Sequence, residues 1–494
     1  MPARLLRITY KLVNTETKLL HRLLQAHGLQ ESGADCKEFN LLWSGLQPKP
    51  DVLRSMSPYQ RVNHFPRSYE LTRKDKLFKN VEKMQYFRGL KHFDFIPTTF
   101  LMPAEFKELC STHYRTKGPW IVKPAASSRG RGIYIVKSPE QIPKGENVVV
   151  AKYIDNPLLI GGHKCDLRLY VCVTSIDPLL IYLYEEGLVR FATVKYDTTN
   201  KNLWNPCMHL CNYSINKYHT DYIKCDDPNA GNIGHKWTLS ALLRHLRKAG
   251  RNTTALMAGI EDLVVKSILS SAQTIAAAAR VFVPNFFNCF ELFGYDILVD
   301  DMLKPWLLEI NLSPSLACES PLDARVKSAL LADTLTLVGL PAMPMCRTDT
   351  ANNASLKMRI GANGSGSGTG SSTPAPLATL TSEELRLVRA VRAQYARRGG
   401  FVRIFPSQNS WQKYSQYLVC SNMFYRQGPP AKMCDKDRCA VIAKQLNDFL
   451  YMYYRETDLY TDSEDRDGCV SNIHFAQFLY SARYFKNFKK KIYL

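Results

Sequence analysis

Several features are missing from this 494-residue chain, and each absence removes a class of protein. No window of 18 uncharged apolar residues occurs, because Arg280 and Pro284 interrupt the most apolar stretch, and this argues against a membrane span. The N-terminus lacks the apolar run and cleavage site of a secretory signal. The 14 cysteines include no Cys-x-x-Cys, and even Cys207 and Cys211 lack histidine partners at zinc spacing. We therefore expect a reduced intracellular protein without a membrane segment.

Acidic residues are also scarce: 44 Asp and Glu face 65 Lys and Arg, a formal net charge of +21. The apolar share of 45% is that of a globular protein, and the length suggests about two to four domains. The excess of positive charge implies a polyanionic partner, which is nucleic acid, a membrane surface or an acidic protein. No zinc-finger, basic-zipper or RNP-like motif supports nucleic acid. Aromatic residues between Trp411 and Tyr425 fit a hydrophobic core as well as base stacking.

Composition divides the chain at one place. Residues 361–374 are almost pure Gly, Ser and Thr, which predicts a flexible linker, and their regular alternation is also typical of an engineered one. Before it, short β-rich runs from Trp120 onward and a 3.6-residue apolar period over 238–282 predict one large α+β unit. After it, Thr381 and Glu384 form a capping box, in a tail with 19 Lys and Arg against 11 Asp and Glu. We expect a separate, small, basic helical module there.

The most informative stretch predicts a β-hairpin with its turn at Asp300-Asp301. Glu309 and Asn311 are two residues apart on one strand and share a face, which Asp296 can reach from the partner strand. Burying two carboxylates and an amide without partners among apolar neighbours is costly. An oxygen-rich cluster of this type suits Mg²⁺ that is shared with nucleotide phosphates. The alternative is a solvated hairpin face with incidental acids.

Two other strands end in lysine next to a polar loop. Lys123 is followed by a Ser/Gly/Arg loop around Gly130, in which flexible backbone N–H groups and positive charge suit a phosphate. Lys152 ends the other strand, and Asp166 and Arg168 then alternate on one face. Neither the P-loop nor the Rossmann fingerprint is present. Taken singly, the clusters fit a basic surface loop or a structural ion pair equally well.

Taken in order, the motifs resemble the ATP-grasp ligases and, more narrowly, the glutamate-adding branch of the tubulin tyrosine ligase-like family. The resemblance spans about residues 60–340 and rests on Lys123-Pro, Arg129-Gly-Arg-Gly-Ile133, Tyr153-Ile-x-x-Pro157, Lys164-Cys-Asp-Leu-Arg168, Cys211-Asn-Tyr-Ser-Ile-Asn216, Phe293-Gly-Tyr-Asp296 and Leu308-Glu-Ile-Asn311. It implies an α+β fold with an ATP-grasp-like core and an appended basic helical module that binds microtubules. The implied divisions are three lobes at 1–97, 98–185 and 186–345, a flexible linker at 346–377 and the module at 378–494.

The resemblance also implies roles for individual residues. ATP would lie between two sheets, in contact with Lys123, Arg129, Gly130, Ala151, Lys152, Tyr153, Ile154, Lys164, Cys165, Asp166, Cys211 and Asn212. Asp296, Glu309 and Asn311 would ligate Mg²⁺, and Arg168 and Glu309 would act in catalysis. The family often has Phe and Thr at the positions of Cys165 and Cys211, where we expect neighbouring backbone to keep the nucleotide contacts. The incoming amino acid would meet Arg190, Tyr213, Ser214, Lys236 and Lys327.

The cations in this last set suit glutamate. Arg190, Lys236 and Lys327 match its two carboxylates, whereas tyrosine would need an aromatic slot and glycine would leave space empty. For each lysine a solvated helix position is the alternative. The implied reaction is activation of an acceptor carboxylate by ATP, followed by attack of the glutamate amine on the acyl phosphate.

The expected function is therefore polyglutamylation of acidic tubulin tails by a monomer that uses ATP, Mg²⁺ and free L-glutamate. We expect it in the cytoplasm and cytoskeleton, at the basal body of the cilium or the centrosome. The alternatives are a related ligase that adds glycine or modifies non-tubulin acidic proteins, and a basic nucleic-acid-binding protein without ligase activity.

Overall fold

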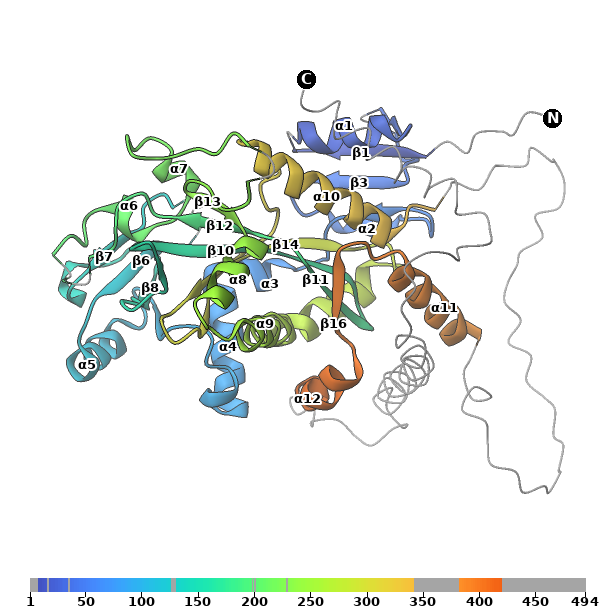
Figure 1. Cartoon of the computed structure of the whole chain (residues 1–494). Coiled ribbons are helices and arrows are strands. Elements are labelled where there is room, and N and C mark those ends of the chain that lie inside the picture. Colours follow the sequence, from blue (N-terminus) through green and yellow to red (C-terminus); the bar gives the residue numbers. More distant parts are fainter. Residues whose placement is uncertain are drawn as a thin grey trace, which may run out of the picture.

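The computed structural model describes residues 8–15, 17–33, 36–125, 130–197, 199, 201–227, 230–341 and 382–419. Within these ranges the chain forms three β-sheets with helices around them (Figure 1), so the predicted mixed α+β class is confirmed. Four predicted features lie outside the described residues: Arg129, the capping residue Thr381, the linker at 346–377 and residues 420–494. In the described part of the chain, none of the helices is both long and apolar enough to cross a bilayer.

The N-terminal region forms a small parallel sheet in the order β2-β1-β3-β4. Its strands are β1 (Thr9–Val13), β2 (Gln30–Glu31), β3 (Leu41–Ser44) and β4 (Arg61–Val62). Its helical elements are α1 (Lys18–Ala26), α2 (Pro50–Arg54), α3 (Tyr69–Thr72), α4 (Lys74–Arg88) and the 3-10 turn η1 (Leu90–His92). Helix α1 buries Leu20, Leu23 and Leu24, the spacing that places side chains on one helical face.

A second sheet is antiparallel and has the order β5-β8-β6-β7. Its elements are β5 (Thr99–Leu101), α5 (Phe106–Thr116), β6 (Trp120–Pro124), β7 (Tyr134–Val136), the 3-10 turn η2 (Pro139–Gln141) and β8 (Val148–Lys152). Successive side chains of a strand point to opposite faces. On β6, Trp120 and Val122 pack in one apolar cluster with Leu109 of α5, whereas Ile121 and Lys123 line a cleft on the other face.

The large sheet is organised by its longest strand, β10. One edge of β10 pairs with β14, and the other edge pairs first with β12 and then with β11. Strands β13, β15 and β16 extend the sheet beyond β12, β14 and β11, and β9 pairs with the start of β10. The strands are β9 (Leu159–Ile160), β10 (His163–Ile176), β11 (Leu179–Tyr184), β12 (Leu188–Phe191), β13 (Lys236–Thr238), β14 (Glu291–Val299), β15 (Pro305–Asn311) and β16 (Phe401–Phe405).

Helices cover the large sheet on both faces (Figure 1). The helices of this part of the chain are α6 (Pro206–His209), α7 (Tyr213–Asn216), α8 (Leu239–Lys248), α9 (Thr253–Phe282), α10 (Pro321–Val338), α11 (Ser382–Ala396) and α12 (Gln408–Val419). The helix predicted over 238–282 is in fact two helices. Gly250, at a φ of +72°, follows the end of α8, and the Asn252 side chain caps α9 by accepting a hydrogen bond from the Ala255 N–H at 3.0 Å.

The two faces of β10 belong to different layers. Leu167 and Leu169 pack in a core with α9, whereas Tyr170 and Cys172 pack on the opposite face with α10, α11 and α1. The first part of that second face carries Lys164 and Asp166 and lines the cleft toward the small antiparallel sheet instead. The site therefore lies where one face of the large sheet is left uncovered by α10.

The prediction of a separate helical module after the linker is wrong for residues 382–419. Strand β16 pairs antiparallel with β11 and so joins the large sheet, and buried side chains of α11 share a core with α10. The buried Gln394 amide oxygen accepts hydrogen bonds from Thr174 Oγ1 at 2.8 Å and Tyr182 Oη at 3.1 Å. The Gly/Ser-rich stretch and the arginine-rich segment after it predicted a domain boundary. The five-residue strand β16 pairs with a strand more than 200 residues earlier, and such non-local pairing leaves no signal in the neighbouring sequence.

The predicted boundary at residue 185 is also corrected. Strands β10 and β11 belong to the large sheet, so the small antiparallel sheet of the central region ends at Lys152. The sequence shows a series of similar β-rich runs in this region. Which sheet each run joins depends on pairing with β14, more than 100 residues further along the chain.

Candidate active site

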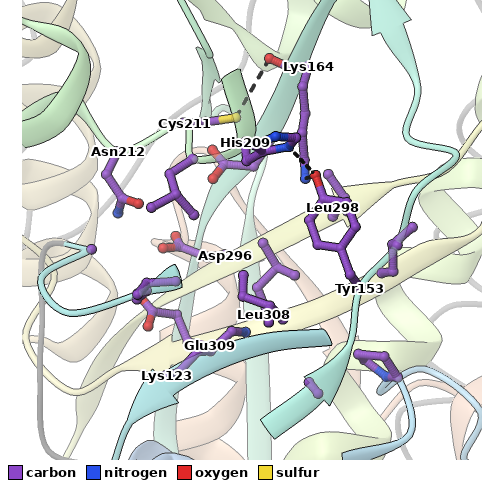
Figure 2. A pocket seen from close by; sticks show the side chains of 18 of the residues that line it. Lys123, Tyr153, Lys164, His209, Cys211, Asn212, Asp296, Leu298, Leu308 and Glu309 are labelled. Carbon is purple, nitrogen blue, oxygen red and sulfur yellow. Dashed lines mark hydrogen bonds between the residues drawn. The ribbon is translucent and has the colours of Figure 1, made fainter. Parts of the chain in front are cut away.

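A cleft of about 870 Å³ lies between the small antiparallel sheet and the large sheet (Figure 2). It brings together most of the residues predicted from the sequence. The predicted residues that line it are Lys123, Gly130, Ala151, Lys152, Tyr153, Ile154, Lys164, Asp166, Arg190, Cys211, Asn212, Asp296 and Glu309. These residues come from separate strands and loops of both sheets, so the cleft is assembled by the tertiary fold.

Charged residues form a row across the face of the large sheet that borders the cleft. Directly opposed residues of adjacent strands share a face. The register pairs Lys236 with Arg190, Arg190 with Asp166, Arg168 with Asp296 and Asp296 with Glu309. Because Asp166 and Arg168 are two residues apart on β10, the row is continuous from β13 to β15. Asp166 and Arg168 thus lie on one face of β10, as the Lys-x-Asp-x-Arg motif predicted.

At the centre of this row, two carboxylates and two guanidiniums form a buried network. Arg190 binds Asp166 through two hydrogen bonds of 2.7 and 2.8 Å, and its Nη2 lies 3.0 Å from Asp296 Oδ2. Arg168 binds the same Asp296 through Nε at 2.5 Å and Nη2 at 3.0 Å. Burial acts to raise the pKa of Asp296, but the two guanidiniums outweigh it and hold that pKa well below its usual range. Asp296 is therefore ionised and held in position.

Lys74 is a site residue that the sequence analysis did not assign. It begins α4, and its Nζ lies 2.8 Å from Glu309 Oε2, at the edge of the cleft. Lys123 lies in the same part of the cleft, where burial lowers its pKa to about 8, with Glu309 acting in the opposite direction. Two lysines from different lobes thus surround one carboxylate. No local motif marks Lys74, because it is one of several basic residues between Arg67 and Lys79.

The other end of the cleft holds a hydrogen-bonded chain of polar side chains. Lys164 Nζ donates to Tyr153 Oη at 2.9 Å, and Tyr153 Oη lies 2.8 Å from His209 Nδ1. His209 Nε2 is 3.0 Å from the Asn202 carbonyl, which fixes the ring. Burial lowers the pKa of Lys164 and of His209. His209 was missed from the sequence because it has no metal-ligand partner at a recognisable spacing.

Gly130 is required by the shape of the loop that borders the cleft. Its φ is +75°, a conformation that favours glycine, and a Cβ there would lie 2.6 Å from Ile215 Cδ1 and 3.1 Å from Asn212 Oδ1. The loop therefore approaches the segment that carries Asn212 as closely as backbone allows. This contact brings two predicted ATP-binding residues, 82 positions apart in the sequence, to one wall of the cleft.

The two cysteines predicted beside the nucleotide differ in position. Cys211 lines the cleft, and its thiol donates to the Lys164 carbonyl at 3.6 Å. Cys165 does not line it: this residue is buried in the core beneath the sheet with Leu167 and Leu169. The Cys165 side chain points away from the cleft because successive residues of β10 alternate between its two faces, and the nucleotide contact expected through neighbouring backbone stays a prediction.

The predicted metal-binding residues provide only oxygen atoms to a cation. Asp296 and Glu309 are directly paired between β14 and β15, and Asn311 pairs with Gly294. The Asn311 amide nitrogen donates to the Gly294 carbonyl at 3.2 Å, so the amide oxygen is the atom that remains to ligate. Hard oxygen donors of this kind fit Mg²⁺. Across the described ranges no group of three or more His, Cys, Asp or Glu side chains that could hold a metal ion is found.

A bulge shapes this hairpin in a way that strict alternation does not predict. The register shifts between Asp296 and Ile297, so that Leu308 is an extra residue opposite the pair. Leu308 and Glu309 consequently both line the cleft, whereas Leu307 turns into the core against α9. The predicted turn is confirmed: Asp300 Oδ1 accepts hydrogen bonds from the backbone N–H of residues 302 and 304.

The residues predicted to meet the amino acid separate into two places. Arg190 lines the main cleft, whereas Tyr213 and Lys236 line a smaller cavity of about 260 Å³ beside it. Lys327 does not line either space within the described residues; its ammonium donates to the Ala317 carbonyl. Ser214 follows Tyr213 in α7. Arg190 and Lys236 are opposed on adjacent strands, so the two spaces adjoin along one sheet face.

Comparison with known proteins gives a consistent picture. Residues 52–350 match the tubulin–tyrosine ligase family. Human tubulin polyglutamylase TTLL5 is 48% identical over 437 residues, which cover 83% of this chain and 34% of that protein. Tubulin polyglutamylase ttll-5 of Caenorhabditis elegans is 36% identical over 456 residues, 84% of this chain and 62% of that protein. Human tubulin monoglutamylase TTLL4 is 39% identical over 400 residues, 76% of this chain and 33% of that protein.

The chain belongs to the tubulin–tyrosine ligase family, and the family assignment made from its motifs is confirmed. It spans about a third of the length of the two human relatives.

Proposed function

We propose that this chain is an ATP- and Mg²⁺-dependent ligase of the ATP-grasp type that adds glutamate to glutamate side chains in acidic tubulin tails. The observation that carries the proposal is the cleft in which thirteen predicted residues meet, with Asp296 and Glu309 paired at its floor. Relatives named as tubulin polyglutamylases at 48% and 36% identity support glutamate and tubulin as substrates.

In this proposal the cleft holds ATP between the two sheets. Lys123 and Lys74 approach the acidic pair Asp296 and Glu309, so this end suits the phosphates. The opposite end, where Tyr153 directly follows strand β8 of the small antiparallel sheet, suits the adenine. Arg129 is proposed as a further phosphate ligand. Asp296, Glu309 and Asn311 would hold Mg²⁺, which neutralises charge on the phosphoryl groups when bound.

The proposed reaction needs no covalent enzyme intermediate. The acceptor carboxylate takes the γ-phosphoryl group of ATP, forming an acyl phosphate and ADP. The amine of free glutamate then attacks the acyl carbon, an amide forms and inorganic phosphate leaves. Arg168 is held against Asp296 by two hydrogen bonds, so its guanidinium is fixed in advance where negative charge develops. Preorganised charge of this kind lowers the barrier without reorganisation during the reaction.

Free glutamate is proposed to lie between Arg190 and the lysines at the adjoining cavity. Arg190 and Lys236 face the same side of the sheet on neighbouring strands, and two separated cations suit a dicarboxylate better than glycine. Tyr213 borders the cavity, and Ser214 is proposed as a further contact. Competition among labelled glutamate, glycine and tyrosine tests this selectivity, and preferential incorporation of glycine would overturn it.

Glu309→Gln tests the proposed site. The variant keeps the shape of the side chain but removes a negative charge that faces Lys74 and the proposed metal. We expect ATP-dependent incorporation of labelled glutamate into microtubules to fall to background. Glu146→Gln, an exposed acid of the small-sheet region, is the matched control and should retain full activity. Full activity of Glu309→Gln would overturn the assignment of the site.

The excess of positive charge leads to a proposal about the partner. We propose that the basic tail binds the acidic microtubule surface, that the protein acts as a monomer, and that it resides in the cytoplasm and cytoskeleton, at the basal body or centrosome. Since residues 382–419 are part of the core sheet, truncation at 378 would remove a core strand. A chain that ends at residue 419 is the proper test, and we expect it to bind microtubules more weakly. Unchanged cosedimentation with microtubules would contradict the proposal that the tail binds them.

A further inference from the structure

One buried carboxylate connects the two lysines that the sequence analysis assigned to the incoming amino acid. Asp323, in the first turn of α10, is 1% exposed and was not assigned a role from the sequence. Lys236 Nζ on β13 lies 2.7 Å from Asp323 Oδ2, and Lys327 Nζ, one helical turn further along α10, lies 3.6 Å from Oδ1. Elements separated by more than 80 residues thus direct two ammonium groups to one carboxylate.

On the basis of the proposed function, we propose that Asp323 is a positioning residue that holds the Lys236 ammonium at the small cavity, toward the incoming glutamate, and keeps the neighbouring Lys327 protonated. It acts through the two lysines and does not itself touch the substrate. The glutamate-binding cations would then depend on a carboxylate that is supplied by the enzyme.

The electrostatic argument begins with burial. The side chains of Lys236 and Lys327 are only 12% and 8% exposed. Ammonium groups that are close together in a low-dielectric site do not both keep their protons without a counter-charge. Burial lowers the pKa of Lys327, and Asp323 acts against this change. Burial also acts to raise the pKa of Asp323, but the lysines outweigh it and hold that pKa below its usual value.

The geometry places one member of this cluster, Lys236, at the wall of a cavity rather than deep in the core. Lys236 lines the 260 Å³ cavity, and it is also the cross-strand neighbour of Arg190 in the main cleft. Its Nζ lies 4.6 Å from the centre of the Tyr213 ring, which lines the same cavity. Lys236 therefore borders the small cavity next to a residue of the main cleft, and its charge and direction affect a ligand in that cavity.

A helix cap is the competing explanation for Asp323. Its Oδ2 accepts hydrogen bonds from the Glu319 N–H at 3.2 Å and from Ser320 Oγ at 3.3 Å, and Ser320 Oγ accepts from the Asp323 N–H. A neutral amide would serve this cap as well. The buried Oδ1, in contrast, accepts no hydrogen bond within the described residues and faces Lys327. The negative charge is thus required by the lysines and not by the helix.

Several other titratable groups surround the cluster and remain unchanged when Asp323 is replaced. They are Arg168 and Tyr170 of β10, Tyr213 of α7, Tyr222 and Lys224 of the following loop, and Cys318 and Glu319 before α10. A difference between wild type and variant across pH therefore reports the loss of the Asp323 charge itself.

Asp323→Asn in the full chain tests the inference, with KM for glutamate and for ATP measured from pH 6.5 to 8.5. The amide keeps the cap but no longer opposes the effect of burial on Lys327, so this lysine loses its proton more readily as the pH rises. We expect the variant to wild-type ratio of glutamate KM to grow from about 2 at pH 6.5 to about tenfold or more at pH 8.5. The KM for ATP should change by less than about twofold.

Asn252→Ala is the matched control, because it removes the N-terminal cap of α9 at a site distant from the lysines. It should lower the melting temperature and leave the pH dependence of glutamate KM unchanged. If Asp323→Asn does not fold, the double variant Asp323→Asn/Lys327→Met removes both charges of the pair and relieves the repulsion. It should fold with a raised glutamate KM that depends less on pH, and an unchanged glutamate KM would overturn the inference.

Two further outcomes separate the inference from the proposed function. A ratio of glutamate KM that is flat across pH in Asp323→Asn, with an active wild type, would overturn the role of Asp323 alone. A wild-type chain that incorporates no glutamate would overturn the proposed function and this inference with it.

Discussion

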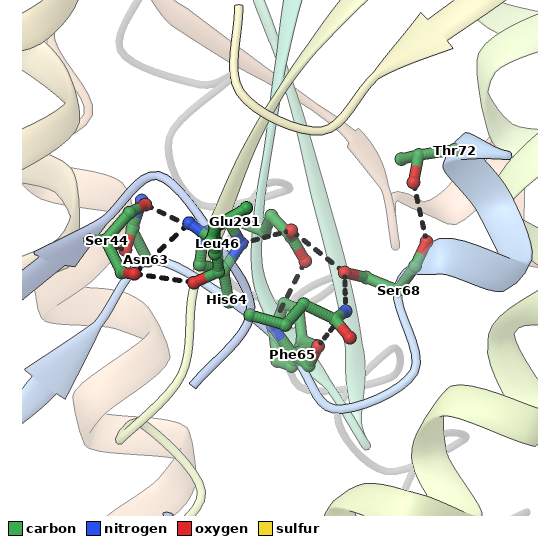
Figure 3. Close-up of polar contacts among 9 residues, drawn as sticks. Ser44, Leu46, Asn63, His64, Phe65, Ser68, Thr72 and Glu291 are labelled. Carbon is green, nitrogen blue, oxygen red and sulfur yellow. Dashed lines mark hydrogen bonds and ion pairs between the residues drawn. The ribbon is translucent and has the colours of Figure 1, made fainter. Parts of the chain in front are cut away.

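Two buried carboxylates on one strand, β14, have opposite surroundings. Glu291 and Asp296 are 0% and 2% exposed and lie on opposite faces of the strand. Glu291 faces the N-terminal region, where its oxygens meet His64 Nδ1 at 2.8 Å, Ser68 Oγ at 3.0 Å and the Phe65 N–H at 3.1 Å (Figure 3). Asp296 faces the cleft and meets two guanidiniums.

Because their partners differ, the pKa values of the two acids are shifted in opposite directions. Burial raises the pKa of Glu291, and its partners, His64 and hydrogen-bond donors, only partly oppose this. The permanent charges of Arg168 and Arg190 more than cancel the same effect at Asp296. Equal burial on one strand therefore gives a carboxyl that holds the N-terminal region to the sheet and a carboxylate that stays ionised at the site. Partner chemistry, rather than depth, decides which role a buried acid has.

The largest effect is expected from Asp296→Asn. The amide leaves Arg168 and Arg190 with uncompensated buried charge, which should cost about 3–5 kcal/mol of unfolding free energy. Glutamate incorporation should fall at least about 100-fold, because the arginines and the proposed metal lose their common anchor. Urea unfolding and the incorporation assay measure the two effects. Asp301→Asn in the exposed turn of the same hairpin is the control, and equal behaviour of the two variants would refute the special status of Asp296.

Glu291→Gln is expected to lower the unfolding free energy by less than Asp296→Asn and to leave the activity nearly unchanged. The substitution keeps the size of the side chain but turns one of its two acceptor oxygens into a donor NH2 group. His64 and Ser68, which share Oε1, and the Phe65 N–H, which donates to Oε2, therefore cannot all keep an acceptor. We expect a loss of about 1–3 kcal/mol of unfolding free energy. The kcat of the folded fraction should stay within about twofold of wild type, because Glu291 faces away from the cleft. A folded variant with abolished activity would show that the two acids are not independent.

The smallest expected effect is on pH dependence. Burial acts to lower the pKa of His64, but the hydrogen bond and charge of Glu291 outweigh it, so the folded pKa lies above the unfolded value. The resulting stability is complete below the unfolded pKa of about 6.5 and is lost as pH rises through the folded value. The raised pKa of Glu291 acts in the same direction. The unfolding free energy of the wild type should therefore fall by about 1 kcal/mol between pH 6 and pH 8.

Glu291→Gln provides the comparison for this pH dependence. Without the carboxylate, the folded pKa of His64 should return toward or below its unfolded value. The decline in stability between pH 6 and pH 8 should then disappear. Denaturant titrations at both pH values decide the matter, and parallel declines in wild type and variant would assign the dependence to other groups.

Much of the cleft was accessible from the sequence because its residues lie in short, ordered motifs. Alternation within a strand correctly put Glu309 and Asn311 on one face, and the same rule explains why Cys165 turns away from the cleft. Lys74 and His209 could not be found in this way. They reach the cleft from a helix start and a short helix whose positions depend on packing between lobes.

The sequence by itself determined the family, the α+β class and most of the residues around the cleft, because these depend on residue type and local periodicity. Only the tertiary structure decided that residues 401–405 complete the large sheet, that a bulge turns Leu308 into the cleft, and that Asp323 joins Lys236 to Lys327. The physical reason is the same in each case. Strand pairing and buried ion pairs join residues that are distant in the chain, and their partners are specified by packing rather than by neighbouring residues.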